Sequence, residues 1–227
     1  MERSAARTAP FSRTRAVGVG TLALAVTAFA ARGVVPNPPK ADPPAAAIAA
    51  FLVVHSHAVM ASSYLDALAV CLLVVATVGM VSLTGADGSP AGVVAVAGVT
   101  LSLGLSLVLD GTIAAATAHH GGGDPVALFR LADVVDLFFA VPGVVFMSGL
   151  GLVLLRSRLL PAIFGWAALA IGAIRVAGGL AGLVSGSGVD EGLFMLSALW
   201  TVGLGITLVA RPSRVRTAAT AAPVATL

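Results

Sequence analysis

Long apolar stretches separated by short polar segments dominate the chain. A membrane-spanning helix needs about 20 consecutive, mostly apolar residues. The stretches that meet this requirement are residues 16–35, 61–83, 91–116, 132–155, 161–184 and 192–210. They are continuous, whereas the strands of a membrane β-barrel alternate apolar and polar residues over about 10 positions. The pattern therefore predicts an all-α fold, a polytopic bundle of about six transmembrane helices.

The segments between these stretches carry turn-forming or charged residues. They are residues 85–90, 121–125, 156–158 and 185–188. Clusters of Gly, Pro, Ser and Asp between periodic segments are typical of loops. The expected organisation is a basic cytoplasmic tail over 1–15, a transmembrane domain over 16–210 and a second cytoplasmic tail over 211–227.

The longest connection joins the first two spans and contains a further apolar pattern. It opens with Pro36-Asn37-Pro38-Pro39, which cannot form a helix. The residues that follow at helical spacing are Ile48, Phe51, Leu52, His55 and Val59. This spacing predicts a short helix at the outer surface of the membrane, running into the second span. One continuous long helix is the alternative.

Composition narrows the class of protein further. Hydrophobic residues make up 58% of the chain and charged residues only 10%, where soluble domains carry about 25%. These values exclude a disordered chain and a typical soluble enzyme. The basic residues stand in short groups between apolar stretches, which suits membrane topology better than contact with nucleic acid. The expected partner is therefore the lipid bilayer, and no nucleic acid is expected.

The positions of the basic residues predict an orientation. The nine that fall on one side of a six-span protein are Arg3, Arg7, Arg13, Arg15, Arg156, Arg158, Arg211, Arg214 and Arg216. The other side receives Arg32, Lys40 and Arg130. Because cytoplasmic loops are enriched in Lys and Arg, both termini are expected in the cytoplasm. The excess of Arg, Ala, Gly and Val favours a bacterial source and hence the bacterial cytoplasmic membrane.

The first span allows a second interpretation. Basic residues, an apolar stretch and the sequence Ala28-Phe29-Ala30 are also features of a cleaved signal peptide. Five spans would then remain, with the N-terminus outside the cell.

Several ionisable residues lie inside the predicted spans, where a charge is costly and therefore suggests function. The candidates for binding a ligand or ion are Asp66, Asp110, Asp133, Asp136, Arg175 and Arg130. All are expected in one layer below the outer surface, with Asp133 and Asp136 in or near the first turn of their span. Excess acid in this layer favours a proton, a cation or an amine. The leading hypothesis is a transporter, sensor or accessory subunit that binds such a ligand.

Pairing between these residues gives the layer a purely structural alternative. Arg130, Asp133 and Asp136 follow one another at intervals of three residues, which places neighbours on one helix face. Arg130 is therefore expected to pair with Asp133. Arg175 needs an acidic partner from another helix, and Asp110 or Asp136 is expected to supply it. Such pairs would tie helices together without binding a ligand.

The histidines raise the questions of metal binding and catalysis. They are His55, His57, His119 and His120. Pairs of histidines can supply metal ligands, but residues i and i+2 point to nearly opposite faces of a helix. They are weak candidates, so no metal site is predicted. An intramembrane enzyme that uses outer-face His and Asp is a second alternative function. Nucleotide-binding and hydrolase motifs are missing from the sequence, and no cofactor is expected.

Small residues at helical spacing suggest close packing between helices. They are Gly178, Gly182 and Gly186 in the fifth span, Gly98 and Gly104 in the third, and Gly143, Ser148 and Gly151 in the fourth. Faces of this kind allow helix backbones to approach one another. The contacts can lie within one chain, or between chains in a homo-oligomer or a complex with another membrane protein. A structural subunit that assembles through these faces is therefore the first alternative function.

Short motifs in three places resemble a family of six-helix bacterial membrane proteins of unknown function, common in actinobacteria. The motifs are Pro38-Pro39 followed by Ala47-Ile48-Ala49-Ala50-Phe51 and His55, then Leu159-Leu160-Pro161 with Gly165-Trp166, and finally Leu199-Trp200. The similarity extends from about residue 36 onward. The acidic residues in the second and fourth spans depart from the family pattern. The resemblance implies the six-helix fold and brings no established activity.

Overall fold

The computed structural model describes residues 12–36, 44–118, 124–157, 159–185 and 190–211. Within these ranges the chain forms seven α-helices and no strand. The helices are α1 (Arg13–Val34), α2 (Ala45–Val54), α3 (Ser56–Thr84), α4 (Pro90–Ala118), α5 (Pro125–Arg156), α6 (Ala162–Ser185) and α7 (Asp190–Ala210). The prediction of an all-α bundle is confirmed.

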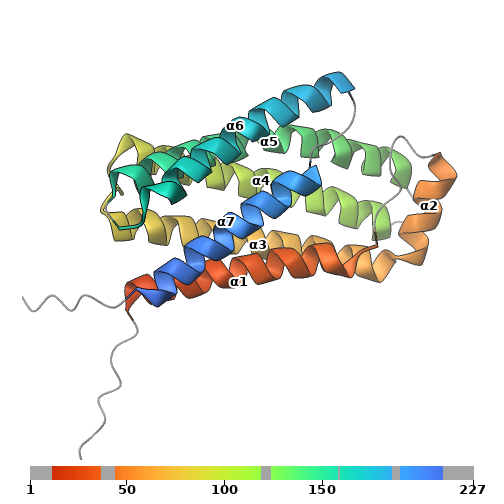
Figure 1. Cartoon of the computed structure of the whole chain (residues 1–227). Coiled ribbons are helices and arrows are strands. Elements are labelled where there is room, and N and C mark those ends of the chain that lie inside the picture. The colour runs from red at the N-terminus through yellow and green to blue at the C-terminus, as the bar shows by residue number, and fades with distance from the viewer. Residues whose placement is uncertain (1–11, 37–43, 119–123, 158, 186–189, 212–227) are drawn as a thin grey trace, which may run out of the picture.

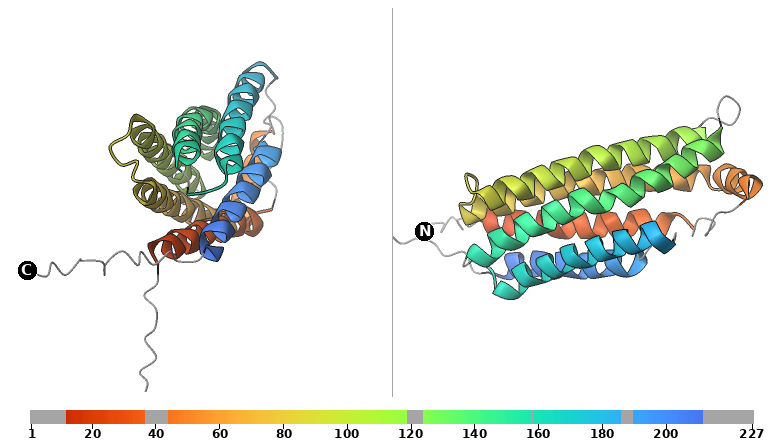
Figure 2. Two further views of the ribbon diagram at one scale, coloured as in Figure 1. Left: turned by 60° about the vertical axis from the view of Figure 1, so that its left-hand side comes forward. Right: turned by 90° about the horizontal axis from the view of Figure 1, so that it is seen from above.

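Six long helices run along one common direction, and α2 lies across one end of them (Figures 1 and 2). Neighbours in the sequence pack side by side from α3 through α6, and α1 packs between α3 and α7. The helices therefore form a ring in the order α7, α1, α3, α4, α5, α6. The ring closes between α6 and α7, which contact each other more sparingly than the other neighbours do.

Five helices are long and apolar enough to cross a membrane. Over the described residues these are α1, α3 and α4 with the segments Phe138–Arg156 of α5 and Gly192–Ala210 of α7. The fifth predicted span corresponds to α6, whose described apolar part, Ala162–Gly178, is shorter. The length and composition of these helices suit a membrane protein, as the sequence predicts.

The connection between the first two predicted spans contains a separate short helix, α2, before α3. Between α2 and α3 the chain turns at His55, whose φ of −109° and ψ of 19° are not helical. Ile48 and Leu52 on α2 are almost fully buried against Val59 of α3 and Ala116 of α4. The short helix is therefore confirmed and the continuous long helix is wrong. Burial of this apolar face holds α2 across the bundle end.

The fourth predicted span begins earlier than the sequence pattern suggests. The Asp124 side chain accepts hydrogen bonds from the backbone N–H groups of Val126 and Ala127, and Pro125 occupies the first helical turn. An Asp N-cap followed by Pro is a strong helix start. Because α5 begins at Pro125, Asp133 and Asp136 lie two to three turns inside it. Their expected place near the start of the membrane span stays a prediction, because the apolar segment of α5 begins only at Phe138.

Glycine contacts occur inside the single chain. A Cβ atom on Gly98 of α4 would overlap the backbone of Phe146 on α5, and one on Gly149 would overlap the backbone of Ala95. A Cβ atom on Gly151 of α5 would lie 3.0 Å from the carbonyl oxygen of Gly165 on α6, a tight but less extreme contact. These close approaches account for Gly98 and Gly151 without a partner chain. The glycine series of the fifth span stays untested, because Gly186 lies outside the described residues.

Candidate functional site: an interior cavity and a polar cluster

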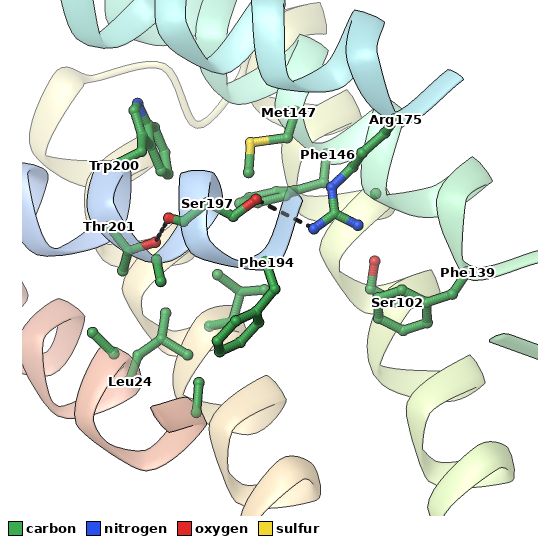
Figure 3. Close-up of a pocket in the computed structure, with 15 residues that line it drawn as sticks. Leu24, Ser102, Phe139, Phe146, Met147, Arg175, Phe194, Ser197, Trp200 and Thr201 are labelled. Carbon is green, nitrogen blue, oxygen red and sulfur yellow. Dashed lines mark hydrogen bonds between the residues drawn. The ribbon is translucent and has the colours of Figure 1, made fainter. Parts of the chain in front are cut away.

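A cavity of about 140 Å³ lies inside the ring, lined by all six long helices (Figure 3). Four aromatic side chains, those of Phe139, Phe146, Phe194 and Trp200, form much of its wall. Most other lining residues are aliphatic or small. The wall is therefore largely apolar, as is usual for small-molecule sites.

Among the described lining residues, Arg175 is the charged one. Its side chain extends from α6 toward α7, where Nη2 donates a hydrogen bond of 3.3 Å to Oγ of Ser197 (Figure 3). Gly143 of α5 borders the guanidinium, and a Cβ there would lie 3.6 Å from Arg175. A larger side chain at position 143 would compete with the guanidinium for this space. Three helices thus position Arg175 at the cavity.

The hydroxyl groups of the wall donate their protons to the backbone. Ser102 donates to the carbonyl of Gly98 at 3.0 Å, Ser197 to Leu193 at 2.8 Å and Thr201 to Ser197 at 2.8 Å. A hydroxyl oxygen that donates in this way still has lone pairs with which to accept. Trp200 likewise donates its Nε1–H to the carbonyl of Phe164 at 2.9 Å. Among the described lining residues, the other side-chain N–H groups are those of Arg175, which has protein partners of its own.

A polar cluster of Arg32, Asp66 and Asp110 lies outside the cavity wall, toward the α2 end of the bundle. Asp110 of α4 is only 8% exposed, and its Oδ2 accepts a hydrogen bond of 2.9 Å from Ser106. Asp66 of α3 is within electrostatic range of both Asp110 and Arg32 of α1. The cluster thus brings ionisable groups from α1, α3 and α4 within electrostatic range of one another.

Aromatic contacts hold Arg32 beside α7. The Arg32 guanidinium carbon lies 4.6 Å from the ring centroid of Phe194, a distance typical of cation–π pairs. Phe194 also makes an edge-to-face contact with Phe29, with ring centroids 5.6 Å apart. Because Phe194 lines the cavity as well, this one ring connects the cavity with the polar cluster.

A buried polar face of α4 also runs between the two regions. Ser102, Ser106 and Asp110 are spaced four residues apart, and all three are buried. Eight residues of α-helix span about 12 Å. Ser102 lines the cavity, so the face leads from the cavity wall to the carboxylate of the polar cluster.

The structure describes the side chains of four of the six residues that the sequence placed in one layer, those of Asp66, Asp110, Arg130 and Arg175. Asp66 and Asp110 fall in the polar cluster, whereas Arg175 lines the cavity. Arg130 is exposed on α5. The side chains of Asp133 and Asp136 lie outside the described part of the structure, so the pairs proposed for Arg130 and Arg175 stay predictions.

The histidines show no metal-binding arrangement in the described part of the chain. His55 packs its ring against Phe51, with centroids 5.0 Å apart, and His57 is exposed. His119 and His120 lie outside the described residues. Among the described residues, no group of three or more His, Cys, Asp or Glu side chains is placed to hold a metal.

Sequence analysis did not identify Arg32, Ser197 or Thr201 as site residues. Arg32 entered the sequence argument only as a topology marker, although it stands in the last turn of an apolar span. Ser197 and Thr201 are four residues apart on α7, and Ser102 and Ser106 are four residues apart on α4. Hydroxyl pairs at this spacing share a helix face and are the signal that the sequence offered.

Comparisons of the chain with protein-family models, with curated proteins and with solved structures found no match.

Proposed function

We propose that this chain is a multi-pass membrane protein that binds a small molecule in its interior cavity, as a transporter or sensor. One observation carries the proposal. About 140 Å³ of space is lined by six helices, and its described lining residues supply aromatic groups, the Arg175 guanidinium and several hydroxyls. Small-molecule sites combine a mainly apolar wall with a few convergent polar groups in this way.

The size of the cavity sets the size of the ligand. An apolar protein cavity of about 150 Å³ binds benzene, so the space here suits a molecule of roughly six to ten non-hydrogen atoms. Larger ligands would have to displace wall residues. The proposal therefore concerns a small metabolite-sized compound and excludes a complete phospholipid.

We further propose that the protein lies in a bacterial cytoplasmic membrane with both termini inside. The start of α1, the end of α5 and the end of α7 lie at one end of the bundle (Figure 1). Arg13, Arg15, Arg156 and Arg211 belong to these ends. Their common location supports the positive-inside orientation. The cavity also depends on α1, because Leu24, Ala25 and Ala28 line it; the proposal therefore requires the first span to be retained.

Proton or cation binding at the polar cluster is the second candidate function. The observation in its favour is the burial of Asp110, whose carboxylate is close to Asp66 and accepts a hydrogen bond from Ser106. Ionisable residues inside membrane helices often mark ion or proton pathways. A transporter that couples ligand binding to such an ion would use both sites.

Photolabelling with a small aryl diazirine tests the cavity. The probe, 3-phenyl-3-(trifluoromethyl)diazirine, is added to the protein in nanodiscs, and labelled peptides are mapped by mass spectrometry. We expect labelling of buried cavity residues such as Phe146 and Met147, besides the exposed apolar faces that meet lipid. Replacing Ala28 with Phe fills the cavity and should abolish only the interior labels.

Ala23→Phe is the matched control, since Ala23 is exposed on the same helix and does not line the cavity. It should keep the interior labels. If the wild-type protein is labelled only on exposed faces such as those of Val141 and Leu199, the cavity does not take up a small molecule and the proposal is wrong.

A further inference from the structure

The cavity wall is less completely covered on the side of α6 and α7 than elsewhere. Arg175 on α6 and Phe194, Ser197 and Thr201 on α7 line the cavity and keep part of their surface exposed. Most of the described lining residues on α1, α4 and α5 are buried, as Phe146 is. The partly exposed wall therefore lies at the seam between α6 and α7.

This seam is also the weakest join in the ring of helices. Helices α6 and α7 contact each other more sparingly than any other two neighbours in the ring. Two described hydrogen bonds cross the seam, from Trp200 to the Phe164 carbonyl at 2.9 Å and from Arg175 to Ser197 at 3.3 Å (Figure 3). Phe164 and Arg175 are about 16 Å apart along α6. Parting the helices at the level of Ser197 therefore disturbs little packing and opens the cavity.

The outer surface at this level is apolar. Ile174 and Val176, on either side of Arg175 in the chain, are exposed, and so is Leu196 beside Ser197. Exposed apolar side chains on membrane-spanning helices meet lipid tails. A charged group in the bilayer interior is costly, so the molecules that reach the seam from the lipid are neutral.

The interior wall suits a neutral ring. Its hydroxyl groups and the Trp200 N–H donate to backbone carbonyls. Phe139, Phe146, Phe194 and Trp200 supply aromatic surface around the space (Figure 3). Aromatic rings pack favourably in edge-to-face or offset arrangements. Apolar contacts with these side chains are therefore enough to hold a small aromatic molecule.

We propose that a small, neutral aromatic compound dissolved in the bilayer enters this cavity laterally between α6 and α7, and that the Arg175–Ser197 hydrogen bond holds the entrance closed. The inference rests on the proposed function, because it names the ligand class and the route for the same cavity. Ser197 then sets the rate at which the ligand enters and leaves, and has little influence on the affinity.

Fluorescence quenching by bromobenzene tests the ligand class. Trp200 lines the cavity, and Trp166→Phe leaves it as the only tryptophan of the chain. With this protein in nanodiscs, bromobenzene should quench Trp200 saturably, and adding Ala28→Phe should abolish the quenching. The charged analogue 4-bromobenzoate should bind at least about tenfold more weakly at equal free concentration in water, because the bilayer and the apolar wall exclude charge.

Stopped-flow measurement of the same quenching tests the route. Ser197→Ala should raise the association and dissociation rates of bromobenzene together, each at least about threefold, because the closed seam loses a hydrogen bond to a charged group. The Kd should change less than about twofold. Ser197→Thr keeps a hydroxyl at this position and should keep rates close to those of the parent protein.

Ser62→Ala is the matched control. The Ser62 hydroxyl donates a hydrogen bond of 3.0 Å to the Ala31 carbonyl and so joins α3 to α1 at a more closely packed seam. Losing this bond should leave both rates unchanged. The comparison of bromobenzene with 4-bromobenzoate uses neither serine variant, so it tests the ligand class even if one of them fails to fold.

The alternative results separate the inference from the proposed function. If bromobenzene quenches Trp200 but Ser197→Ala changes the rates no more than Ser62→Ala does, the cavity stands and the lateral entrance is overturned. If 4-bromobenzoate binds as tightly as bromobenzene, the neutral ligand class is wrong. If bromobenzene does not quench although the diazirine labels the interior, the inference alone fails. If both probes miss the interior, the proposed function fails with it.

Discussion

Arg175 and Ser197 form a hydrogen bond of 3.3 Å between α6 and α7, across the seam where the ring of helices has its sparsest contacts. The bond holds the guanidinium at the cavity and it connects two helices that touch little elsewhere. The same pair therefore bears on the stability of the bundle and on the proposed ligand site.

Ser197→Ala should destabilise the bundle by about 1–2 kcal/mol, since hydrogen bonds to charged groups contribute more than neutral ones. The measurement is unfolding of the purified protein in mixed micelles of increasing SDS. Thr100→Ala is the control, because the exposed Thr100 hydroxyl bonds only to the Val96 carbonyl of its own helix. Equal unfolding curves for Ser197→Ala and Thr100→Ala would show that the bond does not support the seam.

Gly98→Ala should destabilise the protein by roughly 1–3 kcal/mol, because the added methyl group forces α4 and α5 apart at Phe146. Gly104→Ala is its counterpart on the same helix, where nothing lies within 4 Å of an added Cβ. This control should be neutral or stabilise by up to about 1 kcal/mol through helix propensity. Unfolding in SDS compares them; a Gly98→Ala protein as stable as the Gly104→Ala protein would contradict the close α4–α5 contact.

Asp110→Leu should cost about 1–3 kcal/mol more stability than Asp110→Asn. The amide oxygen of Asn can still accept the hydrogen bond from the buried Ser106 hydroxyl, whereas Leu cannot. The exposed loop residue Asp87 provides the control, since Asp87→Leu should change little. Thermal unfolding in one detergent measures the series. Equal stability of the Asn and Leu variants would mean that the Ser106 bond contributes nothing.

A double-mutant cycle on Arg32 and Phe194 should give a coupling of about 0.5–1 kcal/mol, the usual range for a cation–π pair. The cycle uses Arg32→Gln, Phe194→Leu and the double variant, each measured by SDS unfolding. A coupling energy within error of zero would show that the ring does not hold Arg32. The connection between the cavity and the polar cluster would then be lost.

Brominated lipids should quench one tryptophan and spare the other. Trp166 is 64% exposed on α6, whereas Trp200 is 8% exposed and bonded to the Phe164 carbonyl. In liposomes of brominated phosphatidylcholine, the Trp200→Phe protein should therefore lose most of its fluorescence and the Trp166→Phe protein should lose little. The opposite pattern would contradict the placement of the exposed α6 face against lipid.

The helices could be predicted from the sequence because most apolar stretches are long enough to cross a membrane as a single helix. The exception is the start of α5. Arg130, Asp133 and Asp136 interrupt the apolar pattern there, so hydropathy does not identify the first two turns as part of the helix. The signal that sets the true boundary is local, namely Asp124 as a cap followed by Pro125. Hydropathy alone misses this boundary, because capping depends on a single side chain whereas hydropathy is averaged over many residues.

The candidate site could be predicted only in part. Asp66 and Asp110 fall together, as their similar depth suggests, and the structure adds Arg32 to them. Arg175 instead faces a cavity formed by side chains from six helices. No periodicity within one helix encodes such a space, since it depends on how the helices pack. The Arg175–Ser197 pair is likewise a tertiary contact between residues 22 positions apart.

Native mass spectrometry of the protein released gently from its own membrane tests the central claim most directly. We predict that the wild-type chain and the Ala23→Phe control carry a bound molecule of roughly six to ten non-hydrogen atoms, which collisional activation releases. The Ala28→Phe chain, in which the cavity is filled, should be detected without a bound molecule. Bare chains for both the wild-type protein and the Ala23→Phe control would contradict a ligand-binding cavity.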